Sequence, residues 1–180
     1  MVYESKDMTA SVRLPLAGLI VVALAACSSS ASPSVTTAPS PPAGVGFTAV
    51  ALCALVTPAD VSAALGSTVG AGVPSGVNAP SCTWQDPISA AGATIAATDP
   101  GSVGQIPFGL QGISGAHVTA VPGVGDAAFF AAGASGPNTE LDISKGGRAI
   151  TITVGIPGVL DQATVQAAEL AIGQAAAKNM

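Results

Sequence analysis

Residues 140–154, ELDISKGGRAITITV, alternate apolar and polar side chains on both sides of a glycine pair. Leu141 and Ile143 precede the pair, and Ile150, Ile152 and Val154 follow it at every second position. This period of two is typical of strands that bury one face. Gly146-Gly147 supplies the positive φ angles of a tight turn. The stretch therefore predicts an antiparallel hairpin with one face against the core.

Further strands are expected on both sides of this hairpin in the sequence. Residues 82–85 and 93–98 form a second predicted hairpin, whose turn begins at Asp86-Pro87. Residues 118–121 and 127–132 are weaker strand candidates around a Pro-Gly turn, and residues 101–115 are predicted to be loop with at most a short helix at 106–110. Trp84 is interpreted as a core anchor rather than a ligand platform.

Two helices are expected to pack on this sheet. Thr57-Pro58-Ala59-Asp60 has the features of a capped helix start, and Gly66 ends that helix. The last helix is predicted over residues 161–178, with Gln162, Gln166, Glu169 and Gly173 as its polar stripe. The predicted fold class is α+β: an antiparallel sheet of about five strands packed with an N-terminal and a C-terminal helix, with one disulfide.

The amino terminus has the layout of an export signal. Arg13 precedes an apolar run of 13 residues, Leu14 to Ala26, which is too short to span a bilayer permanently. Glu4 and Asp7 lie where positive charge is usual, so translation could start at Met1 or at Met8. Residues 1–26 are predicted to be a signal peptide.

The run ends in Leu24-Ala25-Ala26-Cys27, which resembles the lipobox of bacterial lipoproteins. The resemblance implies that Cys27 carries the acyl chains that anchor the mature protein to the cell membrane, facing the extracytoplasmic side. The alternative is an ordinary signal peptide followed by an incidental cysteine. Residues 27–46 then form a lipidated, Ser/Thr/Pro-rich tether that is open to glycosylation, and residues 47–180 form a single domain.

Charge and cysteine content restrict the partners of this domain. From Cys27 onward, eight Asp and Glu face three Lys and Arg, so the chain is a poor match for nucleic acid. With Cys27 acylated, Cys53 and Cys82 are an even pair in a compartment that permits disulfides, and we predict that they bond. A metal or redox pair is the alternative, but the CxxC spacing is absent.

No catalytic, cofactor-binding or metal-binding residue is predicted. His117 is the only histidine, and the HExxH, GxSxG and Walker motifs are absent. Residues 123–128 match GxGxxA but are interpreted as a turn before an antiparallel strand. Asp86, Asp99, Asp126 and Asp142 are dispersed, and we interpret them as turn formers and solvated charges.

Three segments carry a family resemblance: residues 53–66 (CALVTPADVSAALG), 82–84 (CTW) and 123–130 (GVGDAAFF). Together they resemble small actinobacterial, largely mycobacterial, lipoproteins grouped as a domain of unknown function. The first segment is also similar, more weakly, to the extracellular sensor domains of mycobacterial receptor kinases, which carry a second disulfide. The resemblance implies an address in the cell envelope and transfers no catalytic residue.

Three functions are compatible with these observations. The first is a non-enzymatic envelope protein that binds a small ligand or a protein partner through its sheet face or its Gly-rich loops. The second is a hydrolase or transferase of envelope polymers that uses His117 with an acid such as Asp126. The third is a passive structural surface protein. The oligomeric state is left open by the sequence.

Replacing the lipobox cysteine, Cys27→Ala, is expected to release the protein from membranes because the acyl chains supply the anchor. Phase partitioning in detergent measures the effect: the wild-type chain enters the detergent phase and the variant stays in the aqueous phase. Retention of the variant in the detergent phase would contradict the lipoprotein interpretation.

Overall fold

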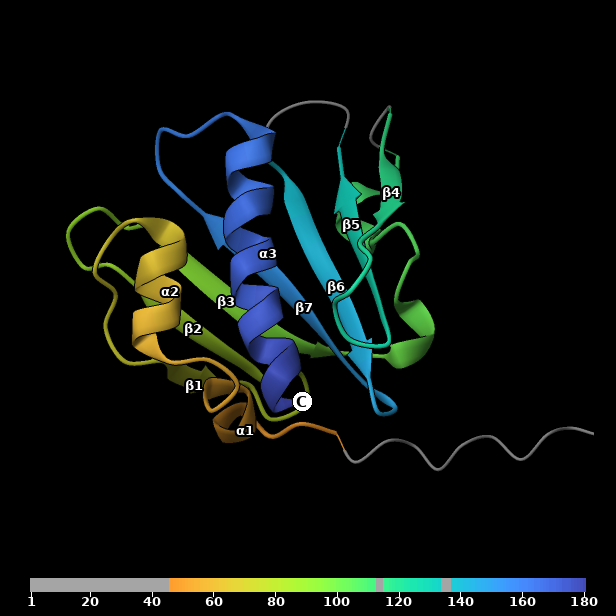
Figure 1. Cartoon of the computed structure of the whole chain (residues 1–180), viewed down its shortest axis with the longest axis horizontal. Helices are drawn as coiled ribbons and strands as arrows, with labels where there is room; N and C mark the ends of the chain where they lie inside the picture. The colour runs from red at the N-terminus through yellow and green to blue at the C-terminus, as the bar shows by residue number, and fades with distance from the viewer. Residues whose placement is uncertain (1–45, 113–114, 134–136) are drawn as a thin grey trace, which may run out of the picture. The chain divides into compact units, whose positions relative to one another are not determined.

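The computed structural model describes residues 46–112, 115–133 and 137–180. The predicted signal peptide, Cys27 and the tether up to residue 45 lie outside the described residues. None of the helices in the described part is both long and apolar enough to cross a bilayer. The strands form one antiparallel sheet in the order β1-β2-β3-β7-β6-β5-β4 (Figure 1). They are β1 (Val73–Ser75), β2 (Ser81–Gln85), β3 (Gly92–Thr98), β4 (His117–Ala120), β5 (Ala127–Ala132), β6 (Thr139–Lys145) and β7 (Arg148–Gly155).

The α+β class is confirmed, but the expected count of about five strands is wrong, because the sheet has seven. The strand β1 was missed because it has only three residues, all exposed, and contains Pro74. Such an edge strand lacks the apolar alternation by which the other strands were recognised. The short helix α1 (Ala49–Cys53) was also missed, since its five residues are too few for a helical period.

The central hairpin is confirmed in its register. Leu141 pairs with Ile152, and Lys145 pairs with Arg148 across the turn. Gly146 and Gly147 have φ angles of 58° and 75°, as the two-residue turn requires. Consecutive side chains of β6 therefore point to opposite faces of the sheet.

The predicted start and end of the helix α2 (Pro58–Leu65) are also confirmed. The backbone N–H of Asp60 donates to the Thr57 hydroxyl at 3.2 Å, and the backbone N–H of Thr57 donates to Asp60 Oδ2 at 2.9 Å. Gly66 ends the helix with a left-handed φ of 66°. The long helix α3 (Gln162–Asn179) begins after its cap residue Asp161.

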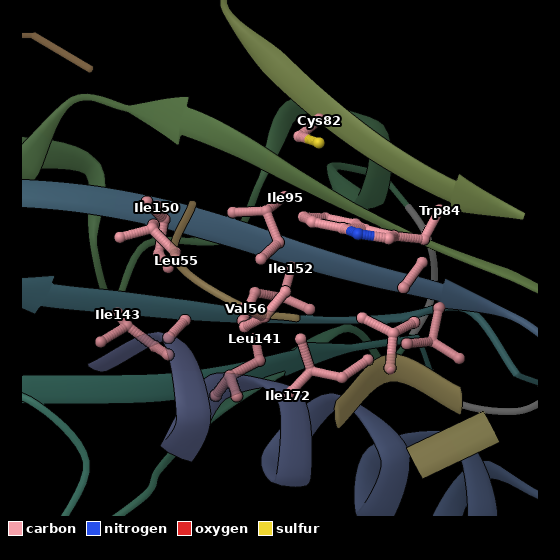
Figure 2. Packing of buried hydrophobic residues seen from close by; sticks show 14 of the residues in the cluster. Leu55, Val56, Cys82, Trp84, Ile95, Leu141, Ile143, Ile150, Ile152 and Ile172 are labelled. Carbon is pink, nitrogen blue, oxygen red and sulfur yellow. The ribbon is translucent and has the colours of Figure 1, made fainter. Parts of the chain in front are cut away.

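The helices α2 and α3 cover one face of the sheet, and the core lies between these layers (Figure 1). Figure 2 shows Trp84 and Ile95 from β2 and β3 together with Ile152, Leu141 and the helix residue Ile172. Trp84 is only 1% exposed, which confirms the expected core anchor. A methyl group in place of the hydrogen of Gly173 would lie 2.6 Å from Leu141 Cδ2, so a side chain there would force Leu141 or α3 to shift.

The predicted polar stripe of α3 is wrong at two of its four positions. Glu169 and Gly173 are buried, and they lie on the face that packs on the sheet. The sequence favoured the opposite assignment because a glutamate on a helix is usually solvated. The buried residues of α3 are Val165, Ala168, Glu169, Ile172, Gly173, Ala176 and Ala177.

The disulfide between Cys53 and Cys82 is present, with 5.2 Å between the two Cα atoms. It joins the end of α1 to the buried strand β2 beside Trp84. Gly72 packs against this cluster, because a Cβ there would lie 2.7 Å from Cys82 Sγ and 2.8 Å from the Trp84 ring. The bond therefore attaches the amino-terminal segment of the domain to the core.

Removing this bond with the pair of changes Cys53→Ala and Cys82→Ala is expected to lower the free energy of unfolding by roughly 3.5 kcal/mol, because the unfolded chain regains the entropy of an open loop. Urea titration followed by the fluorescence of Trp84 measures the loss. Wild-type protein treated with a reductant serves as the control and should unfold at a similar midpoint. An unchanged midpoint in the double variant would contradict this role.

Candidate functional site

The sheet face opposite α3 is polar and rich in hydroxyl groups. The hydroxyls of Thr83 and Thr94 lie 3.1 Å apart on neighbouring strands, and Thr94 pairs in register with Thr153 of β7. Thr151 lies on the same face, two residues before Thr153 in β7. This face of the sheet is therefore a polar surface, whereas the opposite face packs into the core.

Two carboxylates of β6 lie on this polar face. The alternation that turns Leu141 and Ile143 toward α3 turns Glu140 and Asp142 away from it. Asp142 is nevertheless only 5% exposed, and the Thr151 hydroxyl donates to its Oδ1 at 2.6 Å. Among the described residues, no group donates a hydrogen bond to Asp142 Oδ2 or to Glu140.

The segment of residues 99–112 crosses this face and encloses the carboxylates. It contains the 3₁₀ turns η1 (Pro100–Ser102) and η2 (Phe108–Leu110), the second within the short helix expected there. Gly104 lies against the ring of Phe129, where a Cβ would be 3.1 Å from a ring carbon. The result is a cavity of about 280 Å³, here termed the acceptor cavity, lined by Thr98, Ser102, Gln105, Ile106, Pro107, Gln111, Glu140, Asp142 and Thr151.

The free polar atoms of the acceptor cavity are mostly oxygen acceptors. Gln105 Nε2 donates to the carbonyl of Gly101 at 2.8 Å, and Gln111 Nε2 donates to the carbonyl of Ile106 at 3.2 Å. Both amide groups therefore have their carbonyl oxygens left for other partners. The hydroxyls of Thr98 and Ser102 lie 3.2 Å apart and bond to each other.

The electrostatics of the acceptor cavity favour protonation of its acids. Burial, and then the neighbouring charge of Asp142, raise the pKa of Glu140 to about 7. Burial also raises the pKa of Asp142, although the hydrogen bond from Thr151 acts in the opposite direction. Glu140 additionally lines a second cavity of about 440 Å³ with Leu110 and Thr153. The two cavities meet at this glutamate.

A third carboxyl group, that of Glu169, lies on the helix side of the same strand. Its side chain is 0% exposed; the Thr139 hydroxyl donates to Oε2 at 2.8 Å, and Oε1 has no partner among the described residues. Burial raises the pKa of Glu169 to about 8; the hydrogen bond from Thr139 acts in the opposite direction, and the charge of Glu140 adds a smaller rise. Thr139 and Glu140, consecutive residues at the start of β6, therefore contact one buried acid and contribute a half-buried one.

The structure does not bring His117 and Asp126 together. His117 lies exposed at the start of β4, with Nδ1 3.1 Å from the carbonyl of Gly115. Asp126 precedes β5 at the other end, where its Oδ2 accepts from the backbone N–H of Gly146. The length of β5 separates them by roughly 17 Å. His117 instead lines a cavity of about 410 Å³ with Asp161, whose Oδ2 already accepts from Thr164.

The remaining sequence predictions about sites have mixed outcomes. The GxGxxA segment forms a turn that leads into antiparallel β5, with φ angles of 81° at Gly123 and 61° at Gly125. The interpretation of Asp142 as a solvated charge is wrong, because the segment of residues 99–112 covers it. Glu140 and Glu169 were not recognised, since each looks like an ordinary surface residue in its local pattern. No group of three potential metal ligands occurs in residues 46–112, 115–133 and 137–180.

Comparison with protein-family models, with curated protein sequences and with solved structures found no match in any of the three.

The buried acid Glu169 predicts that stability decreases as pH rises. Its pKa is raised on folding from 4.5 to about 8, so the folded chain retains a proton that the unfolded chain loses between these values. The associated stability is complete below about pH 4.5 and is lost as the pH rises to about 8. Glu169→Gln is expected to unfold at nearly the wild-type denaturant concentration at about pH 4 and to be more stable by on the order of 3 kcal/mol at about pH 8.

Urea titrations across this pH range test the effect. The matched control is Glu140→Gln, which removes a half-buried acid adjacent in the chain to Thr139, the hydrogen-bond donor to Glu169. This variant keeps the Glu169 carboxyl, so most of the loss of stability with rising pH should persist. If the free energy of unfolding of the wild-type chain is constant from about pH 4.5 to about pH 8, ionisation of Glu169 does not destabilise the folded protein and the prediction is wrong.

Proposed function

We propose that the chain is a lipid-anchored protein of the cell envelope whose exported domain binds a small ligand in the acceptor cavity without transforming it. The observation that carries the binding role is Asp142, a carboxylate that is 5% exposed and whose Oδ2 lacks a donor among the described residues. The lipobox-like tetrapeptide that ends in Cys27 supports the envelope address.

The energetics of Asp142 support a binding role rather than a structural one. Burying a carboxylate is costly unless hydrogen bonds or an opposite charge compensate for the lost water. The Thr151 hydroxyl compensates at one oxygen, and the other, which is not fully buried, has no donor among the described residues. A ligand that donates to the second oxygen would complete the set, and the cavity of about 280 Å³ has room for one.

The composition of the acceptor cavity also favours binding over turnover. It is lined by amides, hydroxyls, two carboxylates and two apolar residues, and it lacks histidine, lysine and arginine among the described residues. The enzymatic alternative depended on His117 with Asp126, and these residues lie at opposite ends of β5. A hydrolase or transferase would therefore need catalytic residues other than the pair His117 and Asp126.

The proposal is tested by measuring the thermal unfolding of the full chain in mild detergent, through Trp84 fluorescence, with butylamine, calcium chloride, glycerol and glucose as probes. At least one probe is expected to raise the unfolding temperature, because a ligand that binds only the folded state stabilises it. Thr151→Ile, which places a larger apolar group on the cavity wall, should abolish that rise.

The control is Thr119→Ile, which makes the same change at an exposed position of the edge strand β4 and should retain the full rise. If no probe raises the unfolding temperature, or if the rise survives in Thr151→Ile, the acceptor cavity is not a ligand site and the proposal is wrong.

A further inference from the structure

We infer that the ligand of the acceptor cavity is a small organic amine in its protonated form, held by Asp142 and Glu140. This inference rests on the proposed function and specifies its ligand class. It is carried by the placement of unpaired oxygen atoms in the acceptor cavity, by the position of the cations of the domain, and by the mixed polar and apolar lining.

Most of the free hydrogen-bonding atoms of the acceptor cavity are acceptors, so they favour a ligand that donates. Asp142 Oδ2 and the Glu140 carboxylate have no donor among the described residues, and the Gln105 and Gln111 amides each use one of their two N–H groups on a backbone carbonyl. A carboxylate, phosphate or other acceptor-rich ligand would face these oxygens unpaired. An ammonium group carries three donors and a positive charge, and hydrogen bonds to charged acceptors are the stronger kind.

The charges of the domain leave this site uncompensated. Its three cations lie at the end of the domain that holds the β6–β7 turn and the end of α3. There Lys145 donates to the carbonyl of Ala177, and the Arg148 guanidinium lies 5.2 Å from the centre of the Phe47 ring. Lys178 lines a cavity with Lys145 at the same end. Since none of these side chains lines the acceptor cavity, an external cation is the partner that its carboxylates lack.

The lining of the acceptor cavity favours an organic cation over a bare metal ion. A hard divalent ion takes six or more oxygen ligands, usually with several carboxylates. Here two carboxylates are available, and the described residues hold no cluster of three acidic, histidine or cysteine ligands. Ile106 and Pro107 contribute apolar surface to the same wall. An ammonium group on a short hydrocarbon chain would use both kinds of surface.

Protonation of Glu140 should couple this binding to pH. The titratable groups near Glu140 are Asp142 on the same strand, whose charge raises the pKa of Glu140, and Glu169 on α3, whose own pKa the charge of Glu140 raises. The strand β7 and the segment of residues 99–112 present threonine and glutamine to this site. Because burial and Asp142 raise the pKa of Glu140 to about 7, acidification neutralises one of the two partners of the amine. Affinity should therefore decrease as the pH falls below 7.

The experiment is calorimetric titration of the full chain in mild detergent, at constant ionic strength, with butylamine and 1,4-diaminobutane. Butanol serves as the uncharged analogue, and calcium chloride as the metal alternative. The amines are expected to bind and butanol is not. Asp142→Asn and Glu140→Gln should each weaken amine binding about tenfold, which corresponds to one lost charge-assisted hydrogen bond. Lowering the pH from about 8 to about 5.5 should weaken it by a similar factor.

Asp126→Asn is the matched control. It removes the same charge from an exposed turn and should leave amine affinity unchanged, which separates the site from the overall negative charge. Glu140→Gln supplies a second variant should Asp142→Asn fail to fold.

The remaining outcomes separate this inference from the proposed function. Binding of calcium in the titration, or a rise in unfolding temperature with glycerol or glucose, without binding of amines overturns the amine inference and leaves the acceptor cavity as a ligand site. Equal binding of butanol and butylamine, or amine binding unaffected in both cavity variants, also overturns it. Absence of binding by every probe, including glycerol and glucose, overturns the inference and the proposed function together.

Discussion

The close packing of α3 on the central hairpin is the constraint from which the rest of the domain follows. Gly173 lets the helix approach until Leu141 and Ile143 fill the space beneath it. Strand geometry then fixes the direction of the side chains that alternate with these two residues along β6, because neighbouring side chains point to opposite faces. Glu140 and Asp142 are directed away from the helix for the same reason that the isoleucine and leucine are directed toward it. The core thus positions the candidate site.

The elements that could be predicted from the sequence are those whose signal is local. The β6–β7 hairpin has both the alternation and the Gly146-Gly147 turn, and α2 has a complete capping box. By contrast, β1 consists of three exposed residues and gains its structure only by pairing with β2. The sheet was underestimated because pairing with a neighbour, rather than its own residues, makes such an edge segment a strand.

The candidate site had no local signal, because it depends on contacts between distant segments. In the sequence, Asp142 alternates with apolar residues as a solvent-facing charge would. Its burial comes from the path of residues 99–112 over the sheet, which is fixed by contacts such as that of Gly104 with Phe129. Likewise, Glu169 looks like the exposed side of a helix until Thr139 is placed beside it. A periodic pattern indicates which residues lie on the same face of a strand or helix, but it does not indicate which other segment covers that face.

The three buried or half-buried acids are a cost to the fold that local packing does not explain. Glu140, Asp142 and Glu169 have their pKa values raised by burial, which means that their charged forms destabilise the folded chain near neutral pH. A domain selected for stability alone would replace them with amides or apolar residues. Groups that lower stability are found at functional sites, where a ligand supplies the missing interactions. The two acids of the acceptor cavity fit this pattern, because an external cation would be attracted to both carboxylates and would offset their mutual repulsion.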